Sequence, residues 1–174
     1  MVVTTESMIR AQILEVAQQQ IGVVERRNRN DHPKIAEWNR ALGLPANSPY
    51  CASGIYYCYA ANGIRLPIRA PGLVRSWFAD GSKIVYRRSQ RGNTRTGRRP
   101  RLADPVSIFE SHVELLAQER WDEDDDEITV IGFNTTAGSG TRGGVYRVRR
   151  KLGQVKLIAN HLTPYLEKNQ PKGL

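Results

Sequence analysis

The sequence is poor in the residues that cross-link a chain or hold a metal ion. Its 174 residues include only two cysteines, Cys51 and Cys58, and three histidines. The cysteines lie in a segment with helical spacing, two turns or about 10 Å apart, which is too far for a disulfide. Two cysteines without further partners also make a poor zinc site. We therefore expect two reduced thiols, no metal and no cofactor.

Long apolar runs are also missing. No stretch approaches the roughly 18 consecutive apolar residues that a transmembrane helix needs, and 25% of the chain is charged. The first residues carry neither the basic region nor the apolar region of a secretory signal. We therefore expect a protein that is made in the cytoplasm without a signal peptide and has no membrane anchor.

The net charge of +9 is concentrated locally. Residues 87–101 contain seven arginines and no acidic residue, whereas residues 122–127 are all acidic. The first stretch predicts an exposed loop and the second a solvated hairpin tip. A calcium site in the acidic run is the weaker interpretation, because the run lacks the EF-hand pattern.

Helical periodicity fills the first part of the chain and strand periodicity the second. Helices are predicted at residues 6–20, from Pro33 onward and around Cys51, with a short one near Trp77. Strands are predicted at residues 83–86, 105–109, 112–118, 128–133, 145–149 and 155–159, the last two as a hairpin around residues 151–153. This order predicts one α+β domain over residues 1–174, in which an antiparallel sheet carries the arginine-rich insertion at about residues 87–101.

The cysteine segment offers a candidate nucleophile. Asn47 or Ser48 is placed to cap a helix, and Pro49 suits its first turn. Cys51 would then lie where free N–H groups and the helix dipole favour a thiolate. The plainer interpretation of such a residue is a small buried hydrophobe, and this is the role we expect for Cys58.

A nucleophilic cysteine needs a base and a group that orients it. His112 stands at the head of a predicted central strand, where it can face a helix N-terminus; His32 and His161 are less well placed. Asn134 ends the next strand and can fix the tautomer of His112. The predicted catalytic residues are therefore Cys51, His112 and Asn134.

Four motifs in this order resemble the CHAP family of cysteine, histidine-dependent amidohydrolases and peptidases. Residues 49–58 (Pro-Tyr-Cys-Ala-Ser-Gly-Ile-Tyr-Tyr-Cys) are similar to the family's cysteine motif. Residues 103–109, 111–113 and 131–135 resemble its strand motif G-D-I-V-x-F, its G-H-V and its E-G-N-T. Residues 22–25 and 75–77 are similar to segments of phage-type members. The resemblance spans residues 9–159.

The resemblance implies a papain-like fold, with N-terminal helices packed on an antiparallel sheet, and cleavage of amide bonds in bacterial peptidoglycan. It leaves open whether the enzyme is an endopeptidase or an amidase. Tyr50 and Glu25 become candidates for binding the oxyanion or the substrate. We expect a monomer that reaches the cell wall after release, as a phage lysin or an injected effector.

Two departures from the family's pattern leave alternative functions open. The family's glutamate in E-G-N is Gly132 here, so a catalytically degraded domain is one alternative. The arginine-rich stretch suggests another, a module that binds nucleic acid or anionic cell-wall polymers. Nucleic acid is the less favoured partner, because the stretch lacks interleaved aromatic residues on which bases could stack.

Overall fold

Four α-helices lie within residues 5–90 and 97–169, the part of the chain that the computed structural model describes. They are α1 (Glu6–Gln19), α2 (Pro33–Arg40), α3 (Cys51–Ala60) and α4 (Leu162–Asn169). The first three match predicted helices, whereas α4 occupies a segment for which none was predicted. In these two ranges no helix has the length and apolar character needed to cross a membrane.

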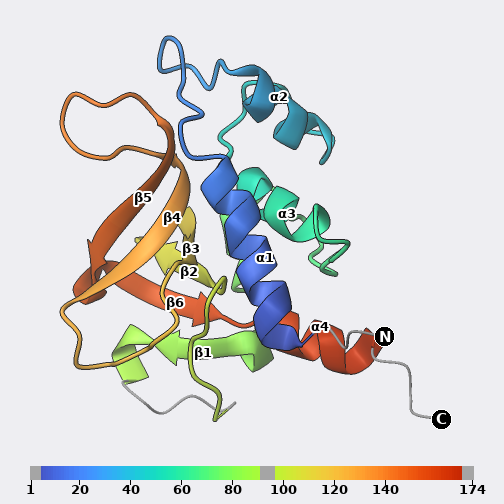
Figure 1. The fold of residues 1–174 in the computed structure, drawn as a ribbon, viewed down its shortest axis with the longest axis vertical. Coiled ribbons are helices and arrows are strands. Elements are labelled where there is room, and N and C mark those ends of the chain that lie inside the picture. Colours follow the sequence, from blue (N-terminus) through green and yellow to red (C-terminus); the bar gives the residue numbers. More distant parts are fainter. Residues whose placement is uncertain (1–4, 91–96, 170–174) are drawn as a thin grey trace.

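The second half of the chain forms one sheet, as predicted. Its strands are β1 (Ile84–Arg87), β2 (Pro105–Ile108), β3 (His112–Leu116), β4 (Glu127–Thr135), β5 (Gly144–Lys151) and β6 (Val155–Ala159). They are arranged in the order β1-β6-β2-β3-β4-β5, and every neighbouring pair is antiparallel. This confirms the α+β class (Figure 1). The predicted arginine-rich loop begins inside β1, and its residues 91–96 lie outside the described part.

The predicted final hairpin is wrong. β5 is an edge strand whose neighbour in the sheet is β4, while β6 lies between β1 and β2. In a flat sheet β5 and β6 would be about 19 Å apart, yet the link from Lys151 to Val155 can span at most about 15 Å. The sheet therefore curls until its far strands approach each other, and the short turn Leu152–Gln154 closes the gap.

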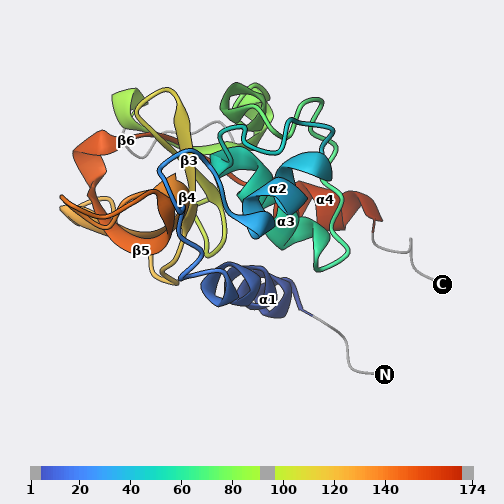
Figure 2. The ribbon, with the colours of Figure 1, turned by 90° about the horizontal axis from the view of Figure 1, so that it is seen from above.

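Each face of the curled sheet has its own apolar core. The helices pack on one face, as the view from above shows (Figure 2), around Ile13, Trp38, Ile55, Leu115 and Phe133. The other face encloses a smaller cluster that includes Val106, Leu116, Val130 and Ile158. Alternate residues of β3 and β4 serve the two cores, as strand geometry requires.

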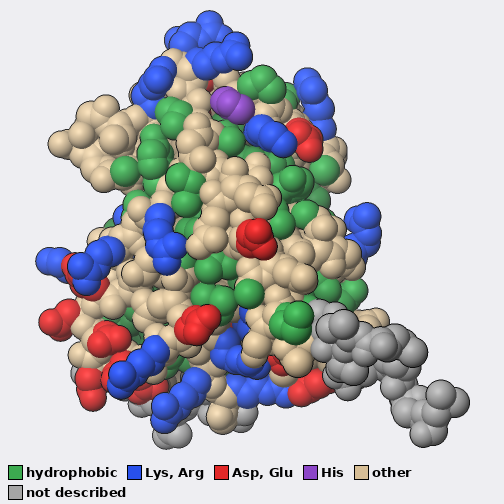
Figure 3. All heavy atoms as spheres, viewed as in Figure 1, with side chains coloured by type: hydrophobic (Ala, Val, Ile, Leu, Met, Phe, Trp, Pro, Cys, Tyr) green, Lys and Arg blue, Asp and Glu red, His purple; other side chains and the backbone are tan. Residues whose placement is uncertain are grey.

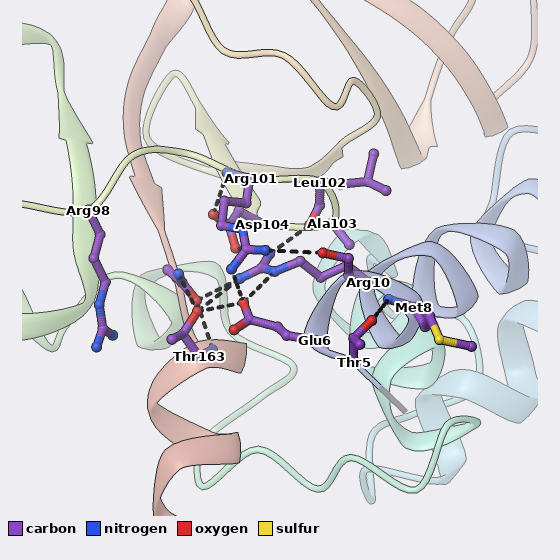
Figure 4. A network of polar contacts seen from close by, with 12 residues as sticks. Thr5, Glu6, Met8, Arg10, Arg98, Arg101, Leu102, Ala103, Asp104 and Thr163 are labelled. Carbon is purple, nitrogen blue, oxygen red and sulfur yellow. Dashed lines mark hydrogen bonds and ion pairs between the residues drawn. The ribbon is translucent and has the colours of Figure 1, made fainter. Parts of the chain in front are cut away.

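A buried ionic network fastens α1 to the sheet and to α4 (Figure 4). Arg10 is 1% exposed and donates to Asp104 Oδ1 over 2.7 Å, just before β2. It also donates to Glu6 and to Asn160 Oδ1. Burial alone would lower the pKa of Arg10, but Asp104 raises it, so the guanidinium stays charged. Asp104 thus makes a structural contact that holds α1 in place.

Candidate active site

Cys51 is the first residue of α3, and Tyr50 is the N-cap. The predicted caps were wrong: Tyr50 occupies that position, no side chain caps the helix, and Asn47, Ser48 and Pro49 precede it. The first N–H groups of a helix have no intrahelical partner. Cys51 therefore lies where unpaired N–H groups and the positive end of the helix dipole meet.

The segment that leads into α3 is held in place by side chains of α2 and α3. Asn39 is fully buried, and its amide nitrogen donates to the carbonyls of Ala46 and Ser48. Its amide oxygen accepts a 2.6 Å hydrogen bond from Ser53, in the first turn of α3. These bonds fix where the chain enters the helix and therefore where the thiol of Cys51 lies.

A glycine lets α3 approach the sheet closely. A Cβ atom on Gly54 would lie 2.5 Å from Cγ of Phe133, on β4, a distance that real side chains do not adopt. Trp38 covers the same ring edge-on, with centroids 5.0 Å apart. The close packing brings the N-terminus of α3 against β3 and β4.

His112, the first residue of β3, lies beside two side chains that favour its charged form. One is Cys51, and the other is Glu114, whose Oε1 lies 3.0 Å from Nε2. Burial alone would lower the pKa of His112, but the contacts with Cys51 and Glu114 raise it to about 9. The imidazole is therefore charged at neutral pH, which is the form that pairs with a thiolate.

Glu114 is fully buried, and a guanidinium binds it. Arg150 Nε donates to Oε2 over 2.9 Å, and Nη2 donates to Oε1 over 2.6 Å. Burial alone would raise the pKa of Glu114, but hydrogen bonds from Arg150 and His112 lower it. The carboxylate is therefore ionised and accepts from His112, which makes it the group that orients the imidazole in this structure.

Asn134, to which the sequence analysis assigned this role, has no hydrogen bond to His112 among the residues that the structure describes. It lies in a bulge of β4, where the register shifts between Gly132 and Thr135, and its φ is 56°. Its backbone N–H lies near the hydroxyl of Tyr50, where it favours the ionised form of that phenol. The contact it makes is thus with the N-cap of α3.

Tyr50 and Glu25 are joined in a buried pair beside the cysteine. The Tyr50 hydroxyl donates to Glu25 Oε1 over 3.0 Å, and the Asn30 N–H donates to Oε2. Burial and Glu25 raise the pKa of Tyr50. Because a phenol has one proton and it is held by Glu25, Tyr50 does not offer it to an oxyanion. The pair instead ties the segment around Glu25 to the start of α3.

The second thiol, Cys58, and the other two imidazoles, His32 and His161, have different environments from Cys51 and His112. Cys58 is 0% exposed, its Sγ contacts the Gly54 carbonyl, and burial raises its pKa. Both thiols are free, as predicted. His32 caps α2, and His161 is buried against the Trp77 carbonyl, which lies 2.7 Å from its Nε2. Burial lowers the pKa of His161 to about 4.

Two residues of the site, Glu114 and Arg150, were not predicted from the sequence. Glu114 follows His112 by two positions, and alternation along a strand places both side chains on one face; this His-x-Glu spacing was the available signal. Arg150 gives no such signal, because it pairs with Ile128 at the far end of β4 and reaches Glu114 only across the curled sheet.

Two arginines of the basic stretch form ion pairs with acidic side chains. Arg101 pairs with Glu6, and Arg98 with Glu167. A cleft of about 670 Å³ is lined by Arg98, Arg99, Arg120, Trp121 and the acidic residues 122–124. Figure 3 shows acidic and basic side chains side by side over the loop between β3 and β4. This mixture is a poor surface for phosphates, and the cleft does not include Cys51.

Within residues 5–90 and 97–169, no cluster of three or more histidine, cysteine or acidic side chains is arranged to hold a metal ion. Comparison of the chain with protein-family models and with curated proteins finds no match.

Proposed function

We propose that this protein is a cysteine hydrolase that cleaves amide bonds in bacterial peptidoglycan, with Cys51 as nucleophile, His112 as acid and base, and Glu114 as the orienting carboxylate. The observation that carries the proposal is the position of His112 between Cys51 and Glu114. A thiol, an imidazole and a buried carboxylate in this order are the parts that nucleophilic catalysis requires.

The first half of the reaction transfers the acyl group to the enzyme. Since Nε2 of His112 is held by Glu114, Nδ1 is the nitrogen left to exchange a proton with Cys51. The thiolate attacks the amide carbonyl, and the backbone N–H of Cys51 is placed to donate to the oxyanion. His112 then gives its proton to the departing amine, so the C–N bond breaks and a thioester remains.

The second half releases the acid. Neutral His112 takes a proton from water, the hydroxide attacks the thioester carbonyl, and the C–S bond breaks as the thiolate leaves. The proton stays on His112, which restores the thiolate–imidazolium pair. Glu114 remains ionised throughout, because Arg150 and His112 both stabilise its charge.

In this proposal three residues have a structural role around the thiol of Cys51, namely Asn134, Tyr50 and Glu25. The hydrogen bond from Tyr50 to Glu25 joins the start of α3 to the segment before α2, and the Asn134 backbone on β4 lies near the same hydroxyl. A direct contact of the Asn134 side chain with substrate is a separate role that the same position allows, since this residue is only half-buried.

The choice of peptidoglycan as substrate rests on the resemblance of four motifs to the CHAP family. The same resemblance favours a lysin or an injected effector that reaches the wall after release. Both an endopeptidase and an amidase use the chemistry above, since each cleaves an amide and leaves an amine and a carboxylate.

The test is to incubate purified protein with peptidoglycan and to identify the new termini by mass spectrometry. The wild type should release fragments with one new amine and one new carboxylate per cut, and the position of the cut separates amidase from endopeptidase. Cys51→Ala should release none, whereas Cys58→Ala should retain cleavage. Intact peptidoglycan after prolonged incubation with folded wild type would contradict the proposal.

A further inference from the structure

We infer that Arg150 is a positioning residue that acts through Glu114, holding this carboxylate ionised and aimed at His112. The inference rests on the proposed function for its catalytic meaning. Its geometry is independent of substrate, because the contacts among Arg150, Glu114 and His112 are all within the protein.

The guanidinium binds the carboxylate in a fork. Nε and Nη2 of Arg150 donate to the two oxygens of Glu114, and Nη2 also donates to Thr135 Oγ1 over 2.8 Å. Two parallel hydrogen bonds fix both the position and the plane of a carboxylate. Oε1 is shared with His112 Nε2, so the fork also fixes the oxygen that the imidazole meets.

The charges around Glu114 explain why an arginine is needed. Glu114 has no solvent exposure, and an isolated buried carboxylate would take up a proton. The groups that face it are His112 on its own strand, Arg150 from β5 and the neutral Thr135 from β4. Arg150 keeps its charge whatever the state of His112. It thus stabilises the carboxylate also during the step in which His112 is neutral.

The experiment follows two pH titrations in the folded protein without substrate. Carbon-13 NMR reports the carboxyl of Glu114, with Glu114→Gln to assign its signal, and iodoacetamide reports the thiolate of Cys51. In Arg150→Met the midpoint of Glu114 should rise by about 1–3 pH units, the range for loss of a close opposite charge. The acid limb of the pH profile for alkylation of Cys51 should shift to higher pH together with the midpoint of Glu114. Arg150→Lys should fall between, since lysine restores charge without the fork.

Arg149→Met is the matched control, because Arg149 neighbours Arg150 on β5 and pairs at the surface with Glu127. It should leave both titrations at wild-type values. If Arg150→Met does not fold, Arg150→Lys decides. The inference is overturned if the folded Arg150 variants titrate as the wild type does. Failure to cleave peptidoglycan would refute the proposed function but would not alter these titrations.

Discussion

Gly132 lies directly opposite Glu114 in the ladder between β4 and β3, and the absence of its side chain leaves room for the carboxylate. A Cβ atom on Gly132 would collide with Glu114 Oε1 and lie 2.8 Å from Cγ2 of Thr135. In the resemblance on which the proposed substrate rests, a glutamate occupies this motif position. In this chain a carboxylate fills the space from the neighbouring strand, and the glycine admits it.

Gly132→Ala should therefore displace Glu114 from His112. We expect the free energy of unfolding to fall by about 1–3 kcal/mol, as for overpacked cores, and hydrolysis of peptidoglycan to fall more steeply than the folded fraction does. Gly153→Ala is the control, because a Cβ atom there meets no atom within 4 Å. Wild-type activity in Gly132→Ala would show that the position of Glu114 does not matter.

The two thiols should differ in reactivity. Cys51 lies at the uncapped start of α3 beside charged His112, whereas burial raises the pKa of Cys58 and closes it to solvent. Iodoacetamide at neutral pH should modify Cys51 first and abolish activity. Peptide mapping after a short exposure measures this. Faster labelling of Cys58, or rapid labelling that persists in Cys51→Ala, would contradict the assignment.

Stability should depend on pH through His112. Burial opposes its charge, but Cys51 and Glu114 raise its pKa to about 9, above the value of about 6.5 in an unfolded chain. The charged imidazole therefore stabilises the fold fully below about pH 6.5, and this contribution is lost as the pH rises toward 9. The difference in unfolding free energy between wild type and His112→Gln, from urea titrations, should shrink over that window. A constant difference would argue against the contacts.

Tyr50→Phe should affect stability more than catalysis. The substitution removes the hydroxyl that donates to buried Glu25. Loss of a buried hydrogen-bond partner costs about 1–3 kcal/mol. Cleavage per folded molecule should fall less than tenfold, because the Tyr50 proton does not reach the oxyanion. A drop of about 10²–10³, typical of a lost oxyanion donor, would restore Tyr50 as a catalytic residue.

The local pattern of apolar residues in the sequence was sufficient to predict most of the helices and strands. Apolar spacing predicted α1 and α2, and alternation predicted β2, β3 and β4 nearly to their ends. The pairing of β5 and β6 was predicted wrongly, because strand neighbours in sequence usually pair and the curl of a whole sheet has no local signal. α4 was missed although Leu162, Tyr165 and Leu166 follow helical spacing, because the segment is short and contains Pro164.

The candidate site was predicted only in part, because some of its contacts also have no local signal in the sequence. Cys51 and His112 follow from helix position and motif, and the structure brings them together. The spacing of His112 and Glu114 along one strand could have indicated the carboxylate, whereas the place of Asn134 depends on a bulge in β4, which no spacing rule reveals. The contact of Arg150 with Glu114 depends on the curvature of the sheet, because the two residues lie far apart in the strand register.

The most direct measurement compares initial rates of peptidoglycan cleavage among four folded variants in one assay. Cys51→Ala and His112→Ala should each lose at least about 10³-fold, and Glu114→Gln about 10²-fold or more, because its amide no longer carries the charge that orients His112. Asn134→Ala should retain most of the wild-type rate. Cleavage by Cys51→Ala, or a greater loss in Asn134→Ala than in Glu114→Gln, would contradict a site built from Cys51, His112 and Glu114.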